Sequence, residues 1–141
     1  MMRRSSTWSL AALTMATLAS CAAPEVRPEL AVITSPIDDV WVTFVQVAKQ
    51  SGFEIESMEP STHLIRAGKD TATRLRGAPD PYQRTPTATQ QQHHDLRVSM
   101  RPRGDQSTAI EIVYTIDKVP DEEATFALLS AVRERLALEG H

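Results

Sequence analysis

The sequence predicts an α+β fold: an antiparallel sheet with two helices packed on one face, in the order β-α-β-β-(long loop)-β-β-α. Two observations carry this prediction. Apolar residues recur at three- and four-residue spacing in two segments, which is typical of helices, and at two-residue spacing in several shorter segments, which is typical of strands. We assign residues 30–141 to this single domain, with a flexible insert at 69–93.

The first strand and the first helix follow one another directly. Residues 30–34 are apolar enough for a strand, and Ser35-Pro36 then predicts a helix start, with Ser35 as N-cap and Pro36 in the first helical position. Gly52 ends the helix because glycine tolerates a left-handed conformation. The apolar stripe of this helix consists of Ile37, Val40, Trp41, Phe44, Val45 and Ala48.

Two hairpins are predicted from two-residue alternation. The first joins residues 53–56 to residues 64–67, and the second joins 96–101 to 110–116 through a turn at 102–105. In the second hairpin we expect Val98 opposite Ile110. That register places Arg97 opposite Glu111.

The second helix begins at Pro120-Asp121 and ends at Gly140. Its predicted inner stripe is Phe126, Leu129, Val132 and Leu136. The insert ahead of the second hairpin contains three prolines, many Thr and Gln residues and few large apolar groups. Such a segment buries too little surface to offset the entropy of ordering, so we expect a mobile loop.

Composition excludes several classes of function. The 141 residues carry a net charge of −3, with 18 acidic residues against 15 Lys and Arg, which argues against a nucleic-acid partner. The single cysteine, Cys21, excludes both an intramolecular disulfide framework and a cysteine-based zinc site. We therefore expect neither a metal site nor a cofactor.

The N-terminus has the features of a secretory signal. Arg3 and Arg4 precede an apolar run at residues 8–18, and small residues precede Cys21. The run spans eleven residues, shorter than the roughly 17 to 25 that a membrane-spanning helix needs. Residues 1–20 are therefore expected to be a signal peptide that is removed.

The sequence Leu18-Ala19-Ser20-Cys21 resembles the lipobox of bacterial lipoproteins. The resemblance implies cleavage before Cys21, lipidation of this residue by a diacylglyceryl thioether, and an acyl chain such as palmitate on its amine. It also implies, through Ala22, sorting to the outer membrane, with the protein lipid-anchored and facing the periplasm. Residues 21–29 then form a lipidated tether. The alternative is an ordinary cleavage site beside an incidental cysteine.

The residues that could act in catalysis or metal binding are better explained by structural roles or by exposure to solvent. Adjacent side chains of His93-His94 point to opposite faces of an extended chain, and we expect solvated loop histidines. His63 has no potential ligand at suitable spacing. The acidic residues at 38–39 and 121–123 lie in first helical turns, where the helix dipole favours them. No catalytic motif occurs, so we expect no enzyme and no catalytic residues.

A basic segment is the sharpest candidate for binding. Residues 69–103 contain seven basic and three acidic side chains. The candidate partner-binding residues are Arg74, Arg76 and Arg84 on the insert, and Arg97 and Arg101 on the outer face of a strand. Such a set suits anionic lipid headgroups or an acidic patch of a protein partner. The alternative is a solvated loop beside a salt-bridged face.

The order of elements, the helix after Ser35-Pro36 with its Trp41, and the strand start Gly52-Phe53 together resemble the helix-grip domains of BamC-like outer-membrane lipoproteins. That family typically has two such domains where this chain has one. The resemblance implies a non-catalytic accessory of β-barrel assembly that binds another envelope protein. We expect a lipid-anchored periplasmic interaction module; the alternative is a periplasmic binder of a small apolar or cell-wall ligand between helix and sheet.

Overall fold

A computed structural model describes residues 26–74 and 89–140 of the chain. Its strands form one six-stranded sheet in which every pairing is antiparallel, and two helices complete the fold. The elements in chain order are β1 (Glu29–Ile33), α1 (Ile37–Gln50), β2 (Glu54–Glu59), β3 (Leu64–Arg74), β4 (Thr89–Pro102), β5 (Thr108–Ile116), β6 (Val119–Pro120) and α2 (Glu122–Glu139). The predicted α+β class is confirmed.

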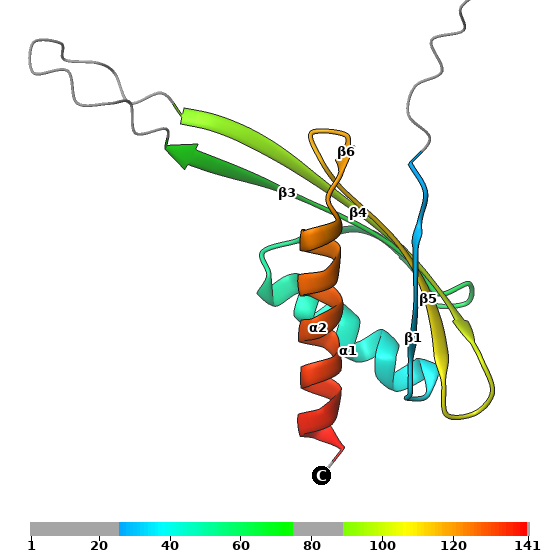
Figure 1. Cartoon of the computed structure of the whole chain (residues 1–141). Helices are drawn as coiled ribbons and strands as arrows, with labels where there is room; N and C mark the ends of the chain where they lie inside the picture. Colours follow the sequence, from blue (N-terminus) through cyan, green and yellow to red (C-terminus); the bar gives the residue numbers. More distant parts are fainter. Residues whose placement is uncertain (1–25, 75–88, 141) are drawn as a thin grey trace, which may run out of the picture.

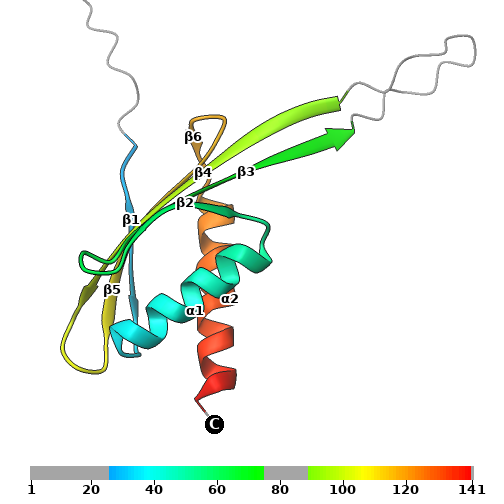
Figure 2. The same ribbon diagram turned by 180° about the vertical axis from the view of Figure 1, so that it is seen from behind.

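The strands are ordered β1-β5-β4-β3-β2, and the short β6 pairs with β5. Both helices lie on one face of the curved sheet, and no helix crosses the opposite face within the described part of the chain (Figure 1). The view from behind shows α1 and α2 crossing one another beneath the sheet (Figure 2). The sheet therefore has an inner face under the helices and an outer face without helical cover.

The predicted insert is shorter than expected. Residues 69–74 continue β3 and residues 89–93 begin β4, so the prediction of a flexible segment was wrong at these positions. Their ladder runs without interruption to the pair Arg74–Thr89 and forms a two-stranded ribbon that projects beyond the helices (Figure 1). Backbone pairing orders this segment, although few of its side chains are apolar. Residues 75–88 lie outside the described part.

The core lies between the inner face and the two helices. Phe44 of α1, Leu96 of β4 and Ile110 of β5 are all 0% exposed. The alternation on β4 and β5 places each second side chain on this face, as the sequence predicts. Burial of these apolar groups is the main source of stability in a domain of this size.

Helix α1 begins one residue later than predicted. Pro36 is the N-cap, and no side chain caps the helix; the Ser35 hydroxyl instead donates to the carbonyl of Thr34 at 2.7 Å. The Ser35 carbonyl accepts a hydrogen bond from Thr108 of β5 at 2.9 Å, which ties the entry of α1 to the sheet. At the other end Gly52 has φ +85°, which confirms its predicted left-handed conformation.

The prediction for α2 was wrong at Phe126. Asp121 caps this helix by accepting from the backbone N–H of Ala124 at 2.8 Å. The side chain of Phe126 is 67% exposed, whereas the predicted Leu129 and Val132 are buried. The buried residues of α2 are Thr125, Leu128, Leu129 and Val132, so Thr125 and Leu128 take the place predicted for Phe126.

The register of the β4–β5 hairpin also differs from the prediction. Val98 lies opposite Ile112 rather than Ile110, and Arg97 lies opposite Val113 rather than Glu111. The ladder extends to the pair Pro102–Thr108, so the loop that joins the strands is longer than the expected turn. A shift of two residues keeps every side chain on its predicted face and changes only its neighbours across the ladder.

The two helical phenylalanines provide a matched test of this packing. We expect Phe44→Ala to lower the free energy of unfolding by about 3 to 5 kcal/mol, because it removes a fully buried ring. The same change at the exposed Phe126 should alter it by less than about 0.5 kcal/mol. Urea denaturation of both variants measures the difference, and equal losses would contradict the observed phase of α2.

Candidate functional site

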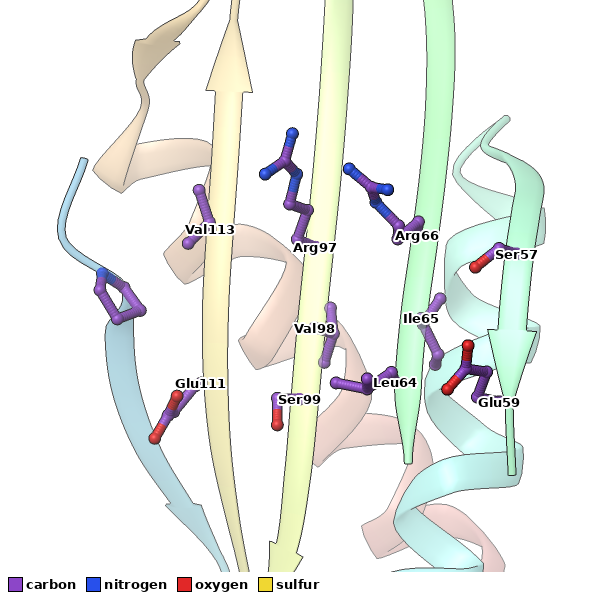
Figure 3. A pocket seen from close by; sticks show the side chains of 11 residues that line it. Ser57, Glu59, Leu64, Ile65, Arg66, Arg97, Val98, Ser99, Glu111 and Val113 are labelled. Atoms are coloured by element: carbon purple, nitrogen blue, oxygen red, sulfur yellow. The ribbon is translucent and has the colours of Figure 1, made fainter. Parts of the chain in front are cut away.

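The outer face of the sheet carries a shallow depression of about 540 Å³. It crosses strands β2, β3, β4 and β5, and Figure 3 shows the side chains that line it. Because side chains alternate along each strand, most of these residues belong to the face opposite the core, while Ile65 and Val98 line the depression from the core side. The lining side chains include Ser57, Glu59, Leu64, Arg66, Arg97, Ser99, Glu111 and Val113.

Two arginines lie side by side in this depression. Arg66 of β3 and Arg97 of β4 are directly opposite each other in the ladder, and both are exposed (Figure 3). Like charges in this arrangement destabilise a sheet by roughly 0.2 to 1 kcal/mol. Arg97 has a long ion pair with Asp95 at 3.4 Å, whereas Arg66 forms no ion pair with any described residue.

The surroundings of the arginine pair are partly apolar and partly acidic. In the next row across the sheet, Leu64 of β3 lies opposite Ser99 of β4, which in turn lies opposite Glu111 of β5. Val113 flanks Arg97 on the other side. A carboxylate placed between the two guanidinium groups would accept hydrogen bonds from both, while an attached apolar group would contact Leu64 or Val113.

The predicted partner-binding residues do not all meet at this depression. Arg97 lines it, and Arg101 is exposed further along the same strand, opposite Ala109. Arg74 is the last residue of β3, opposite Thr89, while Arg76 and Arg84 lie outside the described residues, as does Cys21. Of the predicted set, only Arg97 lines the depression, and the described residues of the set do not meet there.

Arg66 is a residue of this candidate site that sequence reasoning missed. It alternates with Ile65 and Ala67 in a segment already predicted as a strand, so its outward direction was available from the sequence. Its pairing with Arg97 was not, because the two residues are 31 positions apart and meet only when β3 pairs with β4.

The two adjacent histidines are not loop residues. Both lie in β4, so the predicted loop was wrong; His93 is exposed as predicted, whereas His94 is not. His94 is only 8% exposed; its Nε2 is 2.9 Å from the Thr71 hydroxyl and its Nδ1 is 3.0 Å from the Tyr114 hydroxyl. This ring therefore links three strands, β3, β4 and β5.

Their opposite environments shift the two imidazole pKa values in opposite directions. Burial lowers the pKa of His94, and the positive charge of Lys69 lowers it further. The hydrogen bond from Nδ1 of His93 to Asp70, 2.7 Å long, raises the pKa of the exposed His93. Burial and the nearby Asp121 raise the pKa of the Tyr114 hydroxyl.

The remaining candidates have structural roles or lie apart. His63 occupies the turn between β2 and β3 with φ +51°, and its ring meets the edge of Trp41 with 5.4 Å between centroids. Asp38 and Asp39 are exposed in the first turn of α1, and Asp121 caps α2. Within residues 26–74 and 89–140, no three His, Cys, Asp or Glu side chains are grouped to hold a metal ion.

Comparisons with known proteins give no relatives from which a role can be transferred. No protein-family model matches the chain, and no curated protein matches it. Among the described helices, none is long and apolar enough to cross a membrane. The case for function therefore rests on the residues themselves.

The paired histidines give a test by pH. We expect the imidazole of His94 to titrate below the ordinary value of 6.5 and that of His93 to titrate above it. Side-chain NMR of the two imidazole rings measures both titration midpoints. The pH is varied between about 4.5 and 8.5, the range over which an imidazole titrates. Equal midpoints would contradict the described burial of His94.

The same shifts predict the direction of a stability change. Because the folded state disfavours protonated His94, the unfolded chain binds this proton more readily, and stability falls as the pH drops through the ordinary value. His93 acts in the opposite sense: its contribution is present at low pH and is lost as the pH rises through its raised pKa. In a His93→Gln background, replacing His94 by Gln should flatten the remaining pH dependence of urea unfolding.

Proposed function

We propose that this protein is a non-catalytic, lipid-anchored periplasmic module at the bacterial outer membrane, which binds another envelope protein through the outer face of its sheet. The observation that carries the proposal is the open face itself. It combines two adjacent exposed arginines with an apolar wall and has no helical cover within the described residues.

The chemistry of this face favours an acidic protein segment as the partner. In water, the Arg97–Asp95 pair contributes little to stability, since exposed ion pairs are worth roughly 0 to 1 kcal/mol. A partner that covers Arg66 and Arg97 would exclude water from their hydrogen bonds, and charge-assisted bonds then gain in strength and specificity. Leu64 and Val113 add apolar contact beside them.

The lipobox resemblance supports a position of the domain near the membrane. If Cys21 carries the lipid, eight peptide units separate it from Glu29, the first residue of β1. An extended chain of that length spans at most about 28 Å. The sheet would therefore act within a short distance of the outer membrane, where newly inserted proteins and their assembly factors are found. The similarity to BamC-like domains supports a role in envelope or β-barrel protein assembly.

The alternative of a small ligand between helix and sheet receives less support. The side chains that meet there, such as Phe44, Leu96 and Met100, are at most 1% exposed. They occupy the space that such a ligand would need. Binding at this position requires the helices to separate from the sheet and to expose the core.

Lipidation is the first experimental test. In cells labelled with palmitate, the natural chain should incorporate the label and fractionate with the outer membrane, because acyl chains on Cys21 give a stable anchor. The Cys21→Ser variant should lose both properties. A natural chain that stays unlabelled, or that is found free in the periplasm, would contradict the proposal.

The partner face is tested by crosslinking in cells. A photoreactive amino acid at Val113 should yield an adduct with an envelope protein, identified by mass spectrometry. Reversal of charge at Arg66 and Arg97 should reduce this adduct several-fold, because the acidic segment is then repelled. The matched control reverses Arg103, which is exposed in the β4–β5 loop, and should leave the adduct unchanged. Equal adduct yields from the unreversed chain, the Arg66 and Arg97 reversal and the Arg103 reversal would exclude this face as the binding surface.

A further inference from the structure

The two edges of the sheet differ in how they are protected. An unpaired strand edge invites pairing with another chain, and proteins prevent this with charges, bulges or prolines. On β2 the sequence supplies Glu54, Glu56 and Glu59, and its ladder with β3 shifts register between Ile55 and Ser57. The edge at β2 is thus protected by both charge and irregularity.

Among the described residues, the edge at β1 is less protected: its one charged side chain is Glu29 at the start of the strand, and Pro28 precedes the strand rather than interrupting it. Its sequence is Glu-Leu-Ala-Val-Ile, and its five pairs with β5 run without a register shift. Leu30 is 73% exposed and Val32 is 42% exposed, both on the outer face. A regular apolar edge of this kind would be costly to keep free in solution.

We propose that β1 pairs antiparallel with β1 of a second copy of this chain, so that the two sheets become continuous. The two-fold axis passes beside Ala31, which then lies opposite Ala31 of the second copy. In this register, Leu30 of each chain lies opposite Val32 of the other. Both exposed apolar side chains thereby gain cross-strand neighbours on the outer face.

The backbone at this edge fits the proposed register. The guanidinium of Arg133 in α2 donates to the carbonyl of Val32 over 3.4 Å, so this carbonyl points away from β5 and toward the free edge. Groups two residues apart point the same way, and the polar groups of Leu30 therefore face the edge too. In the proposed dimer, the backbone groups of Leu30 form hydrogen bonds with those of Val32 of the second copy, and those of Val32 with Leu30 of the second copy.

Charge complementarity favours a second copy over other strands. Glu29 lies on the inner face with Ala31 and Ile33, which is the face that carries α2. Pairing about Ala31 brings Glu29 of the second copy opposite Ile33, beside Arg133. Arg133 then gives up its long hydrogen bond to the carbonyl of Val32 and forms an ion pair with the carboxylate of Glu29 of the second copy. Because of the two-fold symmetry, the dimer contains two such ion pairs. The two Glu29 residues stay about 14 Å apart along the strands.

The register is tested by disulfide formation in the full chain carrying Cys21→Ser, which removes the only natural thiol. Cα atoms of a directly opposite, non-hydrogen-bonded pair are about 4.5 Å apart, within the range a disulfide spans. Ala31→Cys should therefore give a covalent dimer under mild oxidation. Leu30→Cys is the matched control, because two Leu30 positions lie too far apart to be bridged.

The proposed ion pair is tested by reversing the charges of Glu29 and Arg133 singly and together in the same Cys21→Ser chain. Sedimentation velocity measures the dimer dissociation constant. Glu29→Arg and Arg133→Glu should each raise the dimer dissociation constant about tenfold or more, because two ion pairs are lost. The double variant should restore the natural value, which a general loss of folding would not. A monomeric natural chain, disulfides at Leu30 instead of Ala31, or pairing of β1 with a different protein would overturn the proposal. The test needs neither lipid nor envelope partner, so it is independent of the proposed function.

Discussion

The burial of one face of the sheet beneath α1 and α2 is the constraint on which the other features depend. Leu96 of β4 and Ile110 of β5 are fully buried on this face, and burial alternates along both strands on either side of these two residues. A two-residue period fixes every intervening side chain on the opposite face. Arg97 and Glu111 are therefore held at the outer surface by the packing of their neighbours, and a slip of one residue in either strand would expose the core.

The charged side chains of the outer face form few stabilising contacts with one another within the described residues. This distinguishes the face as a candidate binding surface. Arg66 and Arg97 repel one another across the ladder, and the only ion pair near them in the described residues is the long contact with Asp95. Water screens both effects while the face is free. Once a partner excludes water, the same charges become strong and specific contacts, so the arrangement favours recognition more than stability.

The open face and the edge at β1 would act together in the proposed dimer. Pairing of the two β1 strands extends the outer surface across both copies, with one arginine pair in each. Each β1 begins at Glu29, which is the last residue of the expected tether. Two lipidated ends would therefore leave the dimer close to its two-fold axis, and an assembly with two anchored ends is held at a membrane more firmly than one with a single end.

The sequence alone determined the fold class, the helical and hairpin segments and the outward direction of Arg97, because these depend on local periodicity and on capping residues such as Asp121. It did not determine the continuation of β3 and β4 through residues 69–74 and 89–93, which backbone pairing stabilises in the absence of an apolar pattern. The burial of His94 and the meeting of Arg66 with Arg97 likewise depend on contacts between strands. Only tertiary structure decides such features, because strand register is set by loop length and by the packing of the whole sheet, neither of which is encoded in any one segment.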